Sequence, residues 1–239
     1  MKKLLLSFLL VAITTPFINA QKVINDANAE KRAVNGFHGI HVATGIDLVL
    51  TAGNTEEVAV SAATNEFRDK IITRVENGIL KIYYESKTGA VNKRKETKDL
   101  KAYISYKSLS ELHVSTGAEL TINGVLKSTK LDMTVNTGGL VSGEVDIEKL
   151  KIDQSTGSKV TLSGKAGTLE VDGSTGSKFK GEDMNTTVSN VTVSTGAIVS
   201  VSAEKELQVK ASTGGNVKNK KNPSIRDMKK STGDSITKI

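Results

Sequence analysis

A short tripeptide recurs along the chain at nearly constant spacing, and this repeat restricts the possible folds more than any other feature. Ser-Thr-Gly starts at Ser115, Ser155, Ser174, Ser194, Ser212 and Ser231, with the related Asn136-Thr137-Gly138 and Ala43-Thr44-Gly45. The glycines of these copies are Gly45, Gly117, Gly138, Gly157, Gly176, Gly196, Gly214 and Gly233. From Gly117 onward, the glycines are 21, 19, 19, 20, 18 and 19 residues apart. A fixed period of this kind indicates a repeat architecture.

Two apolar columns accompany the tripeptide when its copies are aligned. The first lies three residues before the tripeptide and holds Ile40, Leu112, Met133, Ile152, Val171, Val191, Val209 and Met228. The second lies five residues after its first residue and holds Leu48, Leu120, Val141, Val160, Phe179, Val199, Val217 and Ile236. Apolar and polar residues alternate around both columns, which is typical of strands with one buried face. Each copy therefore predicts strand, tight turn, strand.

A unit this short cannot bury its own apolar side chains, whereas stacked parallel units can, with strands ~4.8 Å apart and like side chains in ladders. The glycine is expected to take a positive φ at the turn. The sequence thus predicts an all-β fold, a right-handed parallel β-helix (β-solenoid) with ~19-residue turns. If the whole chain after residue 20 stacked in this way, it would make about 11 turns.

The part from residue 21 to 107 is less regular than residues 108–239, because no tripeptide stands between Gly45 and Gly117. This interval has room for about three or four turns. Alternating runs at 58–62, 71–75, 79–84 and 102–106 predict strands, and residues 65–70 suit a short helical turn. The charged residues 87–99 predict a protruding loop. No flexible linker divides residues 21–239, so we expect a single elongated domain.

Residues 1–20 have the three-part pattern of a secretory signal peptide. Two lysines precede an apolar run over residues 4–13, and the small Ala20 suits cleavage. The run is shorter than the about 20 residues that a membrane-spanning helix needs. We therefore expect an exported protein, in the periplasm, on the outer-membrane surface or secreted, with no transmembrane segment in the mature chain.

The composition excludes several chemistries. There is no Cys, and His38, His41 and His113 are the only histidines. Disulfide scaffolds, zinc–thiolate sites and thiol enzymes are excluded, and three histidines offer few candidates for a histidine-based catalytic triad. We expect no cofactor, no bound metal and no catalytic residues.

Three segments resemble a known bacterial family. They are residues 37–50 (FHGIHVATGIDLVL), 77–82 (NGILKI) and 109–123 (LSELHVSTGAELTIN). The family is the putative auto-transporter adhesin, head GIN domain family, which is common in Bacteroidetes, and the resemblance extends over essentially the whole mature chain. It implies a β-helical fold and an exported protein of the cell surface, and it brings no catalytic residues.

Two sets of side chains are candidate sites. Asp153 and Asp172 hold the same place in adjacent copies and are expected about 5 Å apart. Such a pair could bind Ca²⁺ or cleave a polysaccharide by acid–base chemistry. The same column also holds His113, Thr134, Thr192, Lys210 and Lys229, as an ordinary solvent face would. Tyr83 and Tyr103 should face outward by alternation, and they are candidate ligand contacts or two plain surface tyrosines.

Three further features each have more than one interpretation. The recurring threonine could form an ice-binding array, but its place beside the turn glycine favours turn chemistry. Basic residues gather at 87–101 and 205–230 and could contact anionic lipid or acidic polysaccharide, whereas the lack of interleaved aromatics argues against nucleic acid. The last strand, residues 235–239, leaves an edge that suits weak end-to-end self-association.

Together these features predict a non-enzymatic secreted or cell-envelope protein with adhesin-like binding to an unknown envelope, glycan or protein surface. Two alternatives remain open. One is a polysaccharide-active enzyme that uses the Asp153/Asp172 face, and the other is a purely structural envelope protein.

Overall fold

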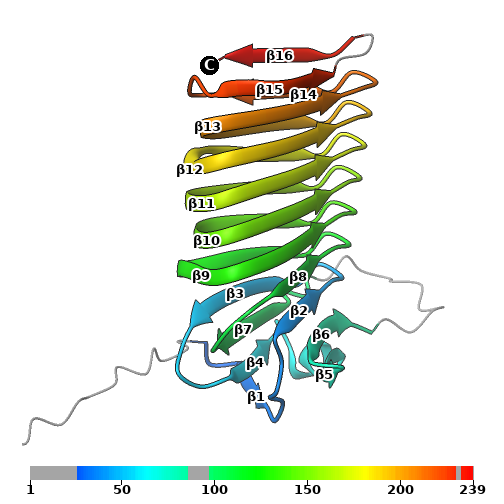
Figure 1. Cartoon of the computed structure of the whole chain (residues 1–239). Coiled ribbons are helices and arrows are strands. Elements are labelled where there is room, and N and C mark those ends of the chain that lie inside the picture. The colour runs from blue at the N-terminus through cyan, green and yellow to red at the C-terminus, as the bar shows by residue number, and fades with distance from the viewer. Residues whose placement is uncertain (1–25, 86–96, 230–232, 239) are drawn as a thin grey trace, which may run out of the picture.

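The computed structural model describes residues 26–85, 97–229 and 233–238. In these residues one 16-stranded sheet coils into a parallel β-solenoid of about 6 turns with ~19 residues per turn (Figure 1). The predicted fold class is confirmed. The predicted signal peptide, and residues 87–96 of the predicted loop, lie outside the described residues.

Long strands build the regular part, and each makes most of one turn. They are β9 (Glu119–Val135), β10 (Leu140–Gln154), β11 (Lys159–Gly173), β12 (Lys178–Val193) and β13 (Ile198–Ala211). The short β8 (Glu111–Val114) precedes them, and β14 (Asn216–Asn219), β15 (Ser224–Lys229) and β16 (Ser235–Lys238) follow. Each long strand bends once on the side opposite the tripeptide turn, as Figure 1 shows.

Both predicted apolar columns form the core. Strand pairing joins their members in order, so Ile152 lies between Met133 and Val171, and Val160 lies between Val141 and Phe179. The members of the first column whose side chains are described are at most 3% exposed. In the second column only Ile236, on the last strand, is more than 2% exposed. Each buried aliphatic side chain contributes ~1.5–3 kcal/mol of hydrophobic stabilisation.

The corner is a two-residue turn in which both central residues have a positive φ. The predicted positive φ of the glycine is found in all eight copies. The preceding threonine also has a positive φ, from 49° to 64° in the seven copies from Thr44 to Thr213. Two successive left-handed residues make a type I′ turn. The turn is closed, for example, by the Ser177 N–H donating to the Ser174 carbonyl (3.0 Å).

The corners are also bonded to one another along the stack. The N–H of Gly157 donates to the carbonyl of Thr175, and the N–H of Gly176 donates to that of Thr195, both at 3.0 Å. Because these bonds satisfy backbone groups that a corner would otherwise leave to solvent, they continue the sheet around the turn.

The strands of the first half of the chain do not stack in the order in which they follow one another in the sequence. One turn consists of β2 (Gly39–Val42) and β3 (Asp47–Ala52). Another consists of β6 (Ile79–Tyr84) and β7 (Lys101–Tyr106). The strand β2 lies between β6 and β8, and β3 lies between β7 and β9, with all pairs parallel. The first turn in the sequence is therefore inserted between two later ones.

The remaining early strands cap the stack instead of extending it. They are β1 (Glu30–Arg32), β4 (Glu57–Ser61) and β5 (Ile71–Glu76). They pair antiparallel, β4 on β7, β1 on β4 and β5 on β6. The predicted helical turn is α1 (Asn65–Arg68), which begins after its N-cap Thr64. Antiparallel strands cover edges that would otherwise be open to another chain, and this explains why about 11 turns was too many.

Candidate functional site

The two candidate tyrosines lie on strands that do not pair with each other. Tyr83 is on β6, which pairs with β2 and β5, whereas Tyr103 is on β7, which pairs with β3 and β4. Both are half-buried, whereas Tyr84 on β6 and Tyr106 on β7 are buried, in agreement with the predicted alternation. The two rings are therefore not brought together by strand pairing.

Each of these tyrosines has a partner within the protein. The hydroxyl of Tyr103 donates to Oδ2 of Asp26 (2.9 Å), and burial together with this carboxylate raises the pKa of Tyr103. The guanidinium of Arg74 lies 5.5 Å from the centre of the Tyr83 ring, which is a cation–π distance. A ligand at either ring would have to compete with these contacts.

Asp153 and Asp172 are register partners on β10 and β11. Lys151 lies between the acidic groups, with Nζ 3.9 Å from Oδ2 of Asp153 and 3.5 Å from Oε1 of Glu170. Partial burial raises the pKa of Asp153; Lys151 opposes the shift and Asp172 adds to it. Within the described ranges, no group of three or more His, Cys, Asp or Glu residues is placed to hold a metal ion. The arrangement is an ion cluster on the solvent face.

A histidine pair was missed by the sequence reasoning. His41 on β2 and His113 on β8 are register partners with ring centroids 4.9 Å apart, and Nε2 of His41 lies 2.5 Å from Oε1 of Glu111. Burial and the neighbouring His41 lower the pKa of His113, against the effect of Glu111. The signal was present, because both histidines stand two residues before a tripeptide.

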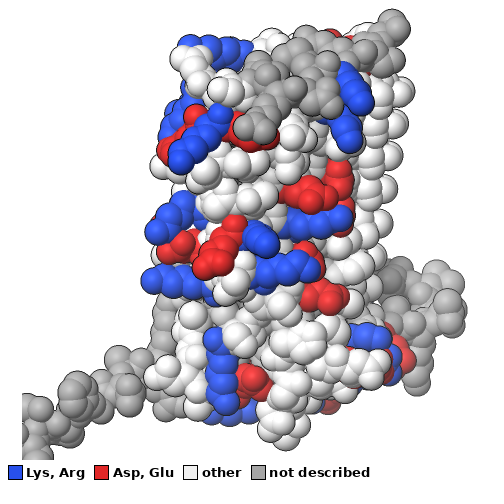
Figure 2. All heavy atoms as spheres, viewed as in Figure 1, with Lys and Arg blue, Asp and Glu red and all other residues white. Residues whose placement is uncertain are grey.

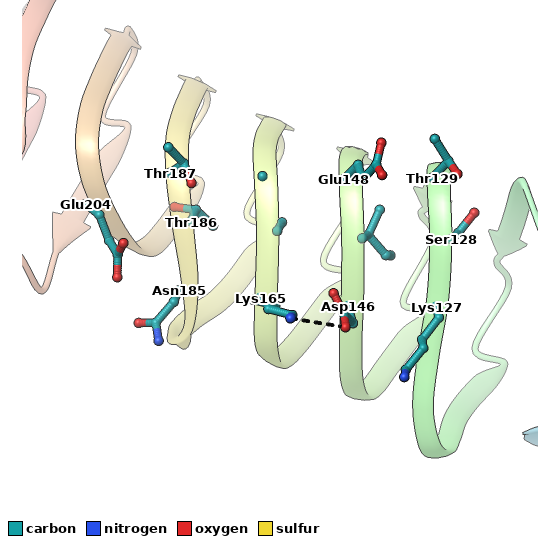
Figure 3. A pocket seen from close by; sticks show the side chains of 13 residues that line it. Lys127, Ser128, Thr129, Asp146, Glu148, Lys165, Asn185, Thr186, Thr187 and Glu204 are labelled. Atoms are coloured by element: carbon teal, nitrogen blue, oxygen red, sulfur yellow. Dashed lines mark ion pairs between the residues drawn. The ribbon is translucent and has the colours of Figure 1, made fainter.

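A groove crosses five successive strands, β9 to β13, at the bend of the solenoid. It encloses about 670 Å³. Its lining residues are Lys127, Ser128, Thr129, Asp146, Ile147, Glu148, Lys165, Ala166, Gly167, Asn185, Thr186, Thr187 and Glu204 (Figure 3). The alignment on the tripeptide did not reveal the groove because the bend lies about half a turn away from it.

The lining side chains form three rows that run across the strands. The first row is Lys127, Asp146, Lys165 and Asn185, and the middle row is Ser128, Ile147, Ala166 and Thr186, each in register. The third row follows the middle one in sequence and is Thr129, Glu148, Gly167 and Thr187. In the middle row Ile147, Ala166 and Thr186 are buried, so this row forms the floor and the outer rows form the walls.

The charges in the groove are largely paired. Nζ of Lys165 lies 3.3 Å from Oδ2 of Asp146, which Figure 3 marks. At the β13 end, Nζ of Lys221 contacts both Oε1 of Glu204 (2.5 Å) and Oδ1 of Asn185 (2.9 Å). Figure 2 shows acidic and basic side chains interspersed over the face in view, without an extended field of one sign. The face in view therefore has no concentrated charge of one sign.

No helix in the described part of the chain has the length and apolar character needed to cross a membrane.

Solved structures with the same fold come from Bacteroides and Parabacteroides species. The chain is similar to a putative adhesin from Bacteroides fragilis, with a TM-score of 0.80 and 16% identity over 88% of this chain and 96% of that chain. It is similar to a putative lipid binding protein from Parabacteroides distasonis, with a TM-score of 0.69 and 18% identity over 90% and 98% of the two chains. It is also similar to a putative adhesin from Parabacteroides merdae, with a TM-score of 0.69 and 14% identity over 88% of this chain and 95% of that chain. At these identities the likeness concerns the fold alone.

The family assignment rests on the sequence. No curated protein matches the chain. The family model described as putative auto-transporter adhesin, head GIN domain matches residues 36–223, which include the inserted turn, the tripeptide repeats through Gly214 and the whole groove. The chain therefore belongs to the putative auto-transporter adhesin, head GIN domain family.

Proposed function

We propose that the protein is an exported, non-enzymatic binding module of the adhesin type, which holds an extended ligand of the cell envelope along the side of its solenoid. The observation that carries the proposal is the groove across β9 to β13. Backbone pairing on both sides of the groove ties these strands together, so the site is held in place before a ligand arrives. The signal-like residues 1–20 and the adhesin-type family support export.

The polysaccharide-active alternative has less support. Glycoside cleavage uses two carboxyl groups in different environments, one of which is kept protonated as the acid. Asp153 and Asp172 sit one strand apart in the same column, and Lys151 lies 3.9 Å from Asp153. They also lie outside the groove. A purely structural role would need no such groove.

A lipid ligand is also less favoured, although one structural neighbour is named a putative lipid binding protein. Ten of the thirteen residues that line the groove carry a hydroxyl, amide or charged group, and Ile147 on its floor is the largest apolar side chain in it. A lipid tail needs a mostly apolar pocket. The solenoid interior is filled by the two apolar columns and the other buried hydrophobic side chains of the core.

The experiment measures binding to cell surfaces together with cleavage of polysaccharides. Purified residues 21–239 are expected to bind bacterial or host cell surfaces saturably and to leave polysaccharide substrates uncleaved. Depolymerisation of any polysaccharide that disappears with Asp153→Asn plus Asp172→Asn would establish the enzyme instead.

Tyr83 and Tyr103 stay in the proposal as additional contacts outside the groove. Tyr83→Ala is expected to weaken cell binding several-fold, because a ring is the strongest stacking surface for a sugar. Tyr103→Phe keeps the ring but removes the bond to Asp26, so comparison with Tyr103→Ala separates ligand stacking from anchoring of the N-terminal segment. Unchanged binding by Tyr83→Ala and Tyr103→Ala would remove these two residues from the site and leave the groove.

A further inference from the structure

We infer that the ligand of the groove is an uncharged, hydroxyl-rich polysaccharide whose chain lies along the solenoid axis, with about one sugar on each strand. This inference rests on the proposed function and names its ligand class. The groove crosses the strands instead of following one of them, so the three-row pattern repeats on β9 to β12, and Glu204 alone lines the groove on β13. A ligand that fits it should itself be a linear repeat.

The spacing of the strands suits such a polymer. Neighbouring strands are ~4.8 Å apart, so the five strands of the groove span about 19 Å from first to last. One sugar with its glycosidic linkage is similar in length to this spacing. A peptide would instead add to an open sheet edge, where its backbone groups find partners. The groove runs across paired strands, whose backbone groups are already bonded to each other.

The side chains in the walls are those that bind hydroxyl groups. Thr129 and Thr187 supply hydroxyls, Asn185 supplies an amide, and Asp146 supplies a carboxylate. Each of them accepts hydrogen bonds, and all but the carboxylate also donate. A vicinal pair of sugar hydroxyls needs this mixture of donors and acceptors.

The third row has no side chain at Gly167. A Cβ added there would lie 2.7 Å from the carbonyl oxygen of Glu148, because the backbone of β10 passes close to this point of β11. No other residue fits without a shift of the backbone, so the third row has side chains on β9, β10 and β12 and none on β11. A sugar beside this point would meet backbone instead of a side chain.

The balance of charge favours a neutral polymer. Lys165 is paired with Asp146, and Lys221 is paired with Glu204. Lys127 and Glu148, which form no ion pair with another described residue, have opposite signs. With Lys221 beside it, the groove thus has three basic and three acidic groups, so an acidic polysaccharide would find no excess of positive charge there and would be repelled by Glu148.

The groove has no aromatic lining residue, so each sugar is held by hydrogen bonds alone. Such contacts are individually weak in water. Affinity should therefore come from the number of strands engaged, as in other multivalent binding. We expect it to rise with chain length up to about five sugars, one for each strand of the groove, and then to level off.

A matched pair of variants on β12 tests the site. Thr187 lines the groove, whereas Thr192 is exposed on the same strand outside it. Thr187→Arg should fill the groove and lower the affinity for neutral β-glucan, mannan or galactan oligosaccharides at least tenfold, and Thr192→Arg should leave it unchanged. Thr129→Arg, at the exposed β9 end of the same row, is a second blocking variant if Thr187→Arg lowers the melting temperature.

The outcomes separate the ligand class from the proposed function. Neutral oligosaccharide binding that depends on Thr187 and levels off near five sugars supports the inference. Binding of polygalacturonate in preference to every neutral chain overturns it, as does neutral binding that both blocking variants leave intact. Adhesion to cells without binding to any polysaccharide also overturns it and leaves the binding function standing. If the wild-type protein neither adheres to cells nor binds any polysaccharide, both the inferred ligand class and the proposed binding function are overturned.

Discussion

Replacing Thr156, Thr175 and Thr195 together with asparagine is expected to stabilise the solenoid by about 2–3 kcal/mol. These threonines are exposed and have φ values of 51°, 49° and 49°. A β-branched residue in this region is strained, since the left-handed conformation costs ~1–2 kcal/mol for most residues. Asparagine tolerates it, and Asn-Gly is the preferred pair of a type I′ turn. Urea unfolding should show a higher midpoint with an unchanged slope.

Thr44 provides the matched control for this prediction. Its Oγ1 accepts a hydrogen bond from the N–H of Tyr84 (2.9 Å), so this threonine joins the inserted turn to β6. Thr44→Val should lower the free energy of unfolding by about 1–2 kcal/mol, because it leaves that N–H without its partner. Thr175→Val, which keeps the shape and removes only the hydroxyl, should change it by less than about 0.5 kcal/mol. Destabilisation by the three asparagines would show that the corner threonines make a favourable contribution that outweighs their strain.

Phe179→Ala is expected to lower the free energy of unfolding by about 3–5 kcal/mol. Phe179 is fully buried between Val160 and Val199 in the second apolar column, where the other members are aliphatic. Truncation would leave a void in the middle of the stack, which its bonded neighbours cannot easily fill. Calorimetry or chemical unfolding measures the loss. A change below about 1 kcal/mol would mean that the column can collapse around the void.

The ring of Phe179 depends on a glycine two residues later. A Cβ on Gly181 would lie 2.5 Å from Cε1 of Phe179. In the preceding turn Val160 is in register with Phe179 and Leu162 follows two residues later, both buried, so there the larger side chain comes second. Gly181→Leu alone should destabilise the protein. The double variant Phe179→Val with Gly181→Leu should lose at least about 1 kcal/mol less free energy of unfolding than the sum of the losses of the two single variants. Additive effects would show that the two positions do not share one space.

The core could be predicted from the sequence because one alignment places every turn. The columns that contain Ile152 and Val160 follow from the tripeptide spacing and the alternation, and strand pairing reproduces them in order. The stacking order of the early strands could not be predicted. The spacing of Gly45 and Gly117 does not indicate that β2 and β3 lie between strands that come later in the sequence. That order depends on the antiparallel capping strands.

The candidate site was harder to predict for a different reason. The tripeptide fixes the register at one corner, and insertions at the bend shift it, as between Thr161 and Ser163 and between Lys180 and Asn185. Residues such as Ala166 and Thr187 therefore belong to no clear column in the alignment. The small side chains of the groove also resemble those of an ordinary strand, and only their juxtaposition across β9 to β13 makes a site.

Amide chemical-shift mapping with a neutral hexasaccharide gives the most direct test of binding along the bend. The groove predicts shifts confined to residues 127–129, 146–148, 165–167 and 185–187 and to Glu204, with the corner at Thr175 and the face that carries Asp153 and Asp172 unaffected. Shifts centred on Asp153 and Asp172, or on Tyr83 and Tyr103 with none in the groove, would contradict it.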